Sequence, residues 1–164
     1  MSAYMTLATP MIDRECLLLA LADLGFGLDV VELHDEPVAL VGYQGRARTE
    51  RAEIVIRRAH VGRASNDIGF ERTETGYRAH VSNYDHPRFG RGWLDQLDAR
   101  YREHDQRKQA RLAEAERRRR EEERKRLVEA QRRAICAQAK KRGYRVEEIR
   151  EGNVVRLVLS RRVY

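Results

Sequence analysis

Proline and glycine are absent from one long stretch of this 164-residue chain. None occurs between Trp93 and Arg142, although the chain holds 3 Pro and 11 Gly in all. These two residue types are the usual interruptions of a helix. The stretch is dominated by Ala, Arg, Glu, Gln, Lys and Leu, which favour helix. The sequence therefore predicts a long helical segment, which as one continuous helix would extend about 75 Å.

Cysteines and long apolar runs are also scarce. Cys16 and Cys136 are the only cysteines and belong to no CxxC or Cys/His pattern. Isolated cysteines favour small buried side chains in a reducing compartment over a disulfide framework. The run CLLLALADLGFGL is too short to span a bilayer, and the charged residues Asp13, Arg14 and Glu15 before it do not make a signal peptide. We expect a cytoplasmic protein with no membrane partner.

Catalytic motifs are missing as well. The chain has no GxGxxG, no phosphate-binding loop with GKS or GKT and no GxSxG elbow. No two of its five histidines lie three or four residues apart, so no helical metal-binding pair exists. We predict no catalytic residues, no cofactor and no metal. The weak candidates for a functional loop, with His80 nearby, are Asp67, Tyr84, Asp85 and His86. An Asp before a strand, however, more often caps a turn.

Charge is concentrated in the part that lacks breakers. Residues 102–142 carry 16 Lys or Arg and 8 Asp or Glu, whereas the remaining residues carry 17 and 18. The whole net charge of +7 therefore belongs to this segment. Few aliphatic residues lie in its middle, so no coiled-coil seam runs through it.

The middle of the segment reads AERRRREEERKR and allows three interpretations: a solvated helix that pairs its own charges, a protein-docking arm, or a nucleic-acid-binding helix. Glutamate precedes a base by four residues in four places, the order that stabilises a helix. The arginines surround the helix and acidic residues accompany them, which favours self-pairing over phosphate binding. Candidate partner or phosphate contacts are Arg117, Arg118, Arg119, Arg120, Arg124, Lys125 and Arg126. The predicted pairs are Glu114–Arg118, Glu116–Arg120, Glu121–Lys125 and Glu122–Arg126.

The rest of the chain predicts a small α+β fold. Asp13 is a plausible N-cap for a helix that stops at Gly25. Strand 77–82 alternates apolar and polar residues, which predicts a mostly antiparallel sheet with one wet face. The expected strands are 4–8, 28–33, 38–43 across an HDEP turn, 52–58, 67–71, and 77–82 across a TETG turn, with a final hairpin of 144–149 and 154–159.

Several short segments, in order along nearly the whole chain, resemble one uncharacterised family. They are MSAYMTLATP, ALADLG, AEIVIRR, DIGF, WLDQLDARY, KKRGYRVEE and VVRLVLSRR. The family is that of a hypothetical chloroplast open reading frame, found in plastids, cyanobacteria and other bacteria. Its genes often lie near genes of AAA-type ATPases and small ferredoxins. The resemblance therefore implies an accessory role, with an AAA-type ATPase as a possible protein partner.

The family passes from the position of Tyr101 to that of Gly143 with roughly one helix, whereas this chain carries about 30 extra residues. We therefore predict an α+β domain formed by residues 1–101 plus 134–164, with a charged helical insertion over 102–133. The insertion is either a long helix, which carries the last strands to another subunit, or a helical hairpin. We favour a fold-back within residues 117–123, which would return these strands to the parent sheet.

These observations predict a non-enzymatic adaptor that acts through protein–protein contacts. Homo-oligomers through the C-terminal strands or the long helix are a further expectation. One alternative is an RNA- or DNA-associated protein that uses the Arg-rich helix. Another is an enzyme of unknown reaction built on the DIGF and NYDH segments.

Overall fold

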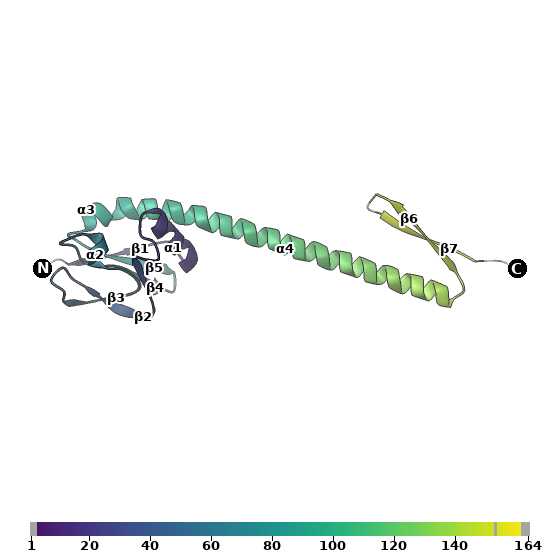
Figure 1. Cartoon of the computed structure of the whole chain (residues 1–164), viewed down its shortest axis with the longest axis horizontal. Coiled ribbons are helices and arrows are strands. Elements are labelled where there is room, and N and C mark those ends of the chain that lie inside the picture. Colours follow the sequence, from purple (N-terminus) through teal and green to yellow (C-terminus); the bar gives the residue numbers. More distant parts are fainter. Residues whose placement is uncertain (1–2, 153, 162–164) are drawn as a thin grey trace. The chain divides into compact units, whose positions relative to one another are not determined.

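The computed structural model describes residues 3–152 and 154–161. The chain divides into two compact units, unit 1 (Met1–Ala110) and unit 2 (Arg111–Tyr164). Unit 1 has a five-stranded antiparallel sheet in the order β1-β5-β4-β3-β2, and unit 2 has a two-stranded sheet of β6 and β7 (Figure 1). The predicted α+β class is confirmed. The strands of unit 1 are β1 (Tyr4–Ala8), β2 (Val31–Val41), β3 (Ala47–Ile56), β4 (Ile68–Thr73) and β5 (Gly76–Ser82).

Helix α1 (Arg14–Asp23) begins and ends as the sequence predicts. The side chain of Asp13 accepts a hydrogen bond from the backbone N–H of Cys16 at 2.9 Å, which satisfies one of the free donors at the helix N-terminus. Gly25 follows the last turn with φ of 93°, a conformation that glycine adopts without steric cost.

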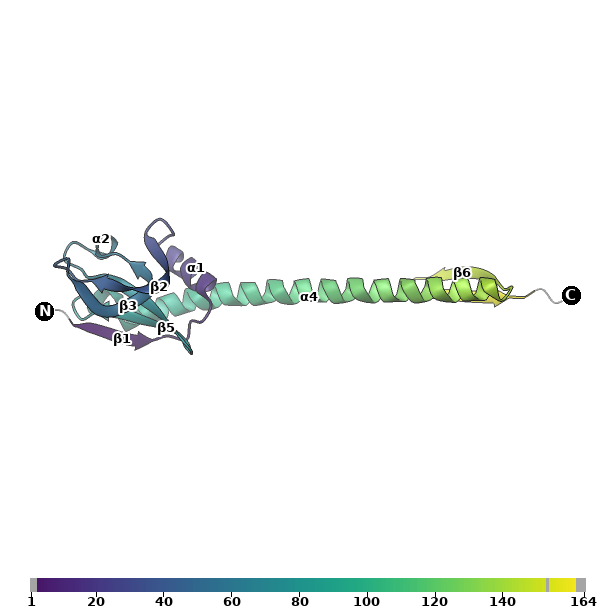
Figure 2. The same cartoon turned by 90° about the horizontal axis from the view of Figure 1, so that it is seen from below.

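The main core lies between one sheet face and two helices. Cys16, Leu17, Ala20 and Leu21 of α1 are buried there together with the start of α4 (Arg91–Lys141). Figure 2 shows α1 beside the first turns of α4. Their contacts include the hydroxyl of Tyr101, which accepts hydrogen bonds from the backbone N–H groups of Ile12 and Asp13. The core residues from the sheet and α4 are Val31, Ile54, Ile56, Ile68, Phe70, Tyr77, Ala79, Val81, Leu94, Leu97 and Tyr101.

The HDEP segment is part of a strand, so the turn predicted there is wrong. Strand β2 runs through it with a shift of register between Leu33 and Val38, which accommodates the extra residues as an irregularity. The chain reverses direction at residues 42–46 instead, where Gly45 has a φ of 79°. Local turn propensity at Asp35 and Pro37 was overridden by the pairing of β2 with β3.

The alternation in β5 predicts that the second face of the sheet is exposed to water. In the structure, part of that face is covered. Leu40, Ala52 and Val55 form a small second core on that side. An added Cβ at Gly69 would lie 2.7 Å from the Cβ of Ala52, so the chain packs closely over this face. His80 and Ser82 of β5 are buried and have polar partners. The ring of His80 lies between Thr6 and Glu71, and the hydroxyl of Ser82 bonds to Asn66 and Asp85.

Helix α4 is continuous through residues 117–123, so the favoured fold-back is wrong. Charge pairing and the absence of Pro and Gly are sufficient for one uninterrupted helix. It ends in a Schellman motif: the N–H of Tyr144 donates to the carbonyl of Ala139, and Gly143 has a φ of 79°. Strands β6 (Arg145–Glu151) and β7 (Val154–Ser160) follow and, in the part of the chain that the structure describes, pair only with each other. The predicted hairpin is confirmed, but its return to the parent sheet is not found. The division into 1–101 plus 134–164 and an insertion over 102–133 stays a prediction.

Two short helices complete unit 1. They are α2 (Arg58–Val61), between β3 and β4, and α3 (His86–Phe89), directly before α4. Gly76, at the end of the TETG turn, has a positive φ.

Candidate functional site

Asp67, the first weak candidate, directly precedes β4 and is fully buried. Its carboxylate accepts hydrogen bonds from the backbone N–H groups of Val41 and Arg58, both at 2.8 Å. It also accepts one from the guanidinium of Arg57 at 2.9 Å. Arg57 reaches in addition to Glu32 at 2.6 Å, and this hydrogen bond lowers the pKa of Glu32. The Asp67 carboxylate therefore ties the ends of β2 and β3 to the start of β4.

Asp85 belongs to a neighbouring buried network. Its carboxylate accepts hydrogen bonds from the backbone N–H and the side-chain amide of Asn66, at 3.0 and 3.2 Å, and from the hydroxyl of Ser82. The structure thus links Asp67 and Asp85 through the adjacent Asn66. Tyr84 is exposed, and the ring of His86 lies against Gly90. The four predicted loop residues therefore do not converge on one surface, and any functional role for them stays a prediction.

His80 makes a set of contacts that the sequence did not reveal. Its Nδ1 lies 3.3 Å from the hydroxyl of Thr6, and its Nε2 lies 3.0 Å from a carboxylate oxygen of Glu71. The same oxygen of Glu71 lies 3.6 Å from Arg78. Hydroxyl, imidazole and carboxylate in this order occur in activated nucleophiles. Here the three groups come from adjacent strands and lie at the distances of ordinary cross-strand pairs. Only the register of β1, β4 and β5 brings them together, so no sequence motif exposes the set.

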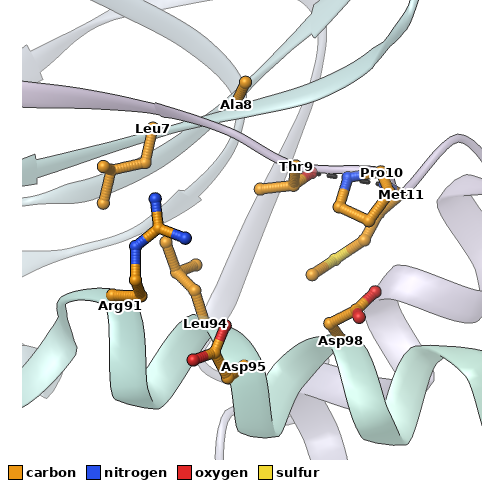
Figure 3. Close-up of a pocket in the computed structure, with 9 residues that line it drawn as sticks. All are labelled: Leu7, Ala8, Thr9, Pro10, Met11, Arg91, Leu94, Asp95 and Asp98. Carbon is orange, nitrogen blue, oxygen red and sulfur yellow. Dashed lines mark hydrogen bonds between the residues drawn. The ribbon is translucent and has the colours of Figure 1, made fainter.

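A small cavity lies between the segment after β1 and the start of α4 (Figure 3). Its volume is about 120 Å³, well below the roughly 300–1,000 Å³ of typical ligand pockets. One Asp98 oxygen binds Arg102 at 2.6 Å, and the other is buried without a hydrogen-bond partner in the described chain. Within the residues that the structure describes, no group of three His, Cys, Asp or Glu side chains could hold a metal ion. The lining residues are Leu7, Ala8, Thr9, Pro10, Met11, Arg91, Leu94, Asp95 and Asp98.

The charged middle of α4 is paired largely as its sequence predicts. Three of the four predicted ion pairs form, with distances of 2.5–2.8 Å, and the hydrogen bond from Lys125 lowers the pKa of Glu121. The fourth, Glu122 with Arg126, is not formed within the described residues. The pairs that form are Glu114–Arg118, Glu116–Arg120 and Glu121–Lys125.

The arginines without a carboxylate partner in the described chain do not share one face. With about 100° between successive residues, Arg117 and Arg124 fall on one side of α4, and Arg119 and Arg126 fall on nearly the opposite side. Nucleic-acid-binding helices gather their bases on one side. This distribution favours a solvated, self-paired helix over a phosphate-binding surface.

The hairpin of unit 2 contacts the end of α4. Arg132 of α4 lies 3.4 Å from Glu148 of β6. Ala139 of α4 is buried. Val146 and Leu157 are half-buried, whereas the remaining hairpin residues are exposed. The exposed apolar residues of unit 2 are Leu112, Leu127, Val128, Ile135, Ile149, Val154, Val155, Val158 and Leu159. Unit 2 therefore presents apolar side chains that nothing covers within the described residues.

Comparison with known protein families gives one match. A family model described as a protein of unknown function, DUF1257, matches residues 20–128. The chain belongs to the DUF1257 family. No curated protein and no solved structure matches it.

The DUF1257 match begins in the last turn of α1, covers strands β2 to β5 and most of α4, and ends before β6 and β7. The exposed hairpin of this DUF1257 protein thus lies outside the matched residues. No helix in the described ranges 3–152 and 154–161 is long and apolar enough to cross a membrane.

Proposed function

We propose that this DUF1257 protein is a non-enzymatic, cytoplasmic adaptor whose unit 2 binds other proteins. The observation that carries the proposal is the exposed hairpin of β6 and β7. A two-stranded sheet is at best marginally stable alone, and exposed apolar side chains on it are typical of a surface that binds a partner. Val154 is 57% exposed and Leu159 is 46% exposed, so burial on a partner would remove substantial apolar surface from water.

Charge indicates what kind of partner unit 2 would take. Residues 111–164 carry 18 Lys or Arg and 9 Asp or Glu, a net charge of +9. Residues 1–110 carry 15 and 17, a net charge of −2. A surface of net negative charge is therefore attracted to unit 2. The bases that encircle α4 favour a protein partner over nucleic acid, because a duplex contacts one face only.

The proposal also includes a more specific family and a candidate partner. We place the chain in the hypothetical chloroplast open reading frame family, on the segments that resemble it, with an AAA-type ATPase as a candidate partner. The division of the chain into a folded unit 1 and a unit 2 with an exposed hairpin suits such an adaptor.

Affinity capture at moderate salt tests the proposal. The full-length chain should retain specific proteins that a Val154→Lys/Val158→Lys variant loses, and an AAA-type ATPase is expected among them. Equal capture by both chains would refute hairpin-mediated binding. Fluorescence anisotropy with labelled oligonucleotides tests the RNA- or DNA-associated alternative. Binding that weakens steeply with salt would favour it over the adaptor.

The enzymatic alternative has a separate test. Both oxygens of Asp67 are already engaged with donors, which leaves this buried carboxylate poorly suited to act as a base or a nucleophile. We expect Asp85→Asn and His86→Ala chains that remain folded to support the same cellular phenotype as the wild type. A loss of phenotype at normal protein levels would favour an enzyme.

A further inference from the structure

Strand β1 is one edge of the five-stranded sheet, and half of its backbone groups point away from the sheet. The N–H of Asn83 donates to the carbonyl of Ala3, and the N–H of Thr9 donates to the carbonyl of Tyr77. Residues 3 and 9 are both odd-numbered. Because backbone direction alternates along a strand, the odd residues of β1 face β5. The N–H and carbonyl groups of Tyr4, Thr6 and Ala8 therefore face the open edge.

Nothing in β1 protects this edge. Its sequence, YMTLA, contains no charge and no proline, and its pairing with β5 has no register shift. The opposite edge, β2, contains Pro37, several acidic residues and two register shifts. Natural sheets use such features to prevent the addition of further strands. β1 is thus the one of the two edges on which a further strand can pair.

The hairpin of unit 2 shows the same asymmetry. Strand β6 reads RVEEIRE, with charged residues at five of seven positions, whereas β7 reads VVRLVLS and carries one charge. The charges protect the outer edge of β6, and the outer edge of β7 is open. The chain therefore contains one open acceptor edge in unit 1 and one donor strand with a single charge in unit 2.

We propose that β7 of one copy of the chain pairs with β1 of a second copy and extends its sheet from five strands to seven. The proposal rests on the proposed function, in which unit 2 is the binding element, and it names the first partner as another copy of this chain. Charge supports this choice, because unit 2 at +9 is attracted to unit 1 at −2, whereas two copies of unit 2 repel each other. When each copy donates its hairpin to the other, the contact closes as a two-fold dimer without free β1 edges.

Light scattering coupled to gel filtration tests the dimer on the full chain. The expected mass is twice the 19.2 kDa of one chain. Thr6→Pro removes an N–H that points outward, so it blocks the edge while the ladder with β5 remains, and it should give a monomer. Thr6→Val keeps the N–H and should remain a dimer.

A second variant removes the donor instead of the acceptor. Val154→Lys/Val158→Lys blunts β7, and because it adds positive charge it cannot act by weakening the attraction to unit 1. It should also be monomeric. Ile149→Lys, an exposed position on the same hairpin face but in β6, is the matched control and should dimerise.

Mixing the two monomeric variants tests directly whether β7 of one copy pairs with β1 of another. The Thr6→Pro chain still has an intact β7, and the Val154→Lys/Val158→Lys chain still has an open β1. Equal amounts should therefore form a heterodimer with one contact, weaker than the wild-type dimer but absent from either variant alone. Circular dichroism establishes that each variant is folded, and an unfolded Thr6→Pro chain is replaced in the test by Thr6→Lys.

Three results would overturn the proposal: a monomeric wild type, a dimer that survives either blocking variant, or no heterodimer on mixing. Survival of the Thr6→Pro dimer would indicate contact between two hairpins, and survival of the β7 variant would indicate contact between two β1 edges. A monomeric wild type that still captures other proteins would refute this inference alone. A dimer that captures nothing would refute the adaptor and leave the strand exchange.

Discussion

Asp67→Ala is the most informative single substitution in unit 1, because it separates a structural carboxylate from a functional one. The Asp67 side chain is 0% exposed and accepts three hydrogen bonds. Its removal leaves the partly buried N–H groups of Val41 and Arg58 without their acceptor. Arg57 retains Glu32 as a partner, so its charge is not stranded.

The expected cost follows from the two orphaned donors. Each donor left unpaired costs about 1–3 kcal/mol, so the free energy of unfolding should fall by about 2–6 kcal/mol. For a unit of this size that corresponds to a decrease in Tm of about 10–25 °C. Asp67→Asn retains one acceptor oxygen, so its free energy of unfolding should lie between those of the wild type and Asp67→Ala.

Trp93 provides the assay. It is the single Trp of the chain and packs edge-on against Phe26 and Phe89, with ring centroids 6.0 and 5.4 Å away. Its fluorescence therefore reports the unfolding of unit 1 in urea or on heating. Asp35→Ala, at an exposed position in β2, is the control and should change stability by less than about 0.5 kcal/mol. An Asp67→Ala chain as stable as the control would refute the argument that this network holds the three strands together.

Three further predictions concern packing, thiol reactivity and pH. Gly69→Ala should lower stability by about 1–3 kcal/mol in a urea titration, because its new Cβ would meet Ala52 and Leu40, whereas Gly92→Ala has open space and should be neutral or slightly stabilising. Burial raises the pKa of the Cys16 thiol to about 11, so a thiol reagent at neutral pH should modify the half-buried Cys136 first, and fast modification of Cys16 in the folded chain would contradict the packing of α1. The hydrogen bond from Arg57 lowers the folded-state pKa of Glu32 below 4.5, so its stabilisation is present above that pH and is lost as the pH falls through the folded value. Glu32→Gln should accordingly flatten the decline of stability in acid, as measured by urea titrations at several pH values.

Local sequence signals predicted the helices and turns of this fold correctly where no long-range strand pairing competes with them. The N-cap at Asp13, the glycines after helix ends and the breaker-free composition of α4 each act within one or two helical turns, so the sequence alone exposes them. The HDEP segment was misread because its turn propensity is also local, whereas the pairing of β2 with β3 that overrides it involves residues far along the chain.

In the candidate site, too, the sequence predicted contacts between neighbouring residues and missed contacts between distant ones. The sequence located the charge of α4 and most of its ion pairs, since those partners are four residues apart. It did not reveal the contacts of His80, and it did not predict the burial of Ser82. Both depend on the order and register of strands, which link residues as much as 74 positions apart.

The sequence by itself thus determined the class of fold, the long helix and the charge that the helix carries, because propensity, capping and i to i+4 pairing are properties of neighbouring residues. Only the tertiary structure decided that AERRRREEERKR lies within one helix that does not fold back, and that the described residues of β6 and β7 pair with no strand of unit 1. Only the strand order made β1 an open edge. The long-range hydrogen bonds that form determine which strands pair and which strand lies at a sheet edge. These bonds join residues far apart in the chain, so local patterns in the sequence do not predict them.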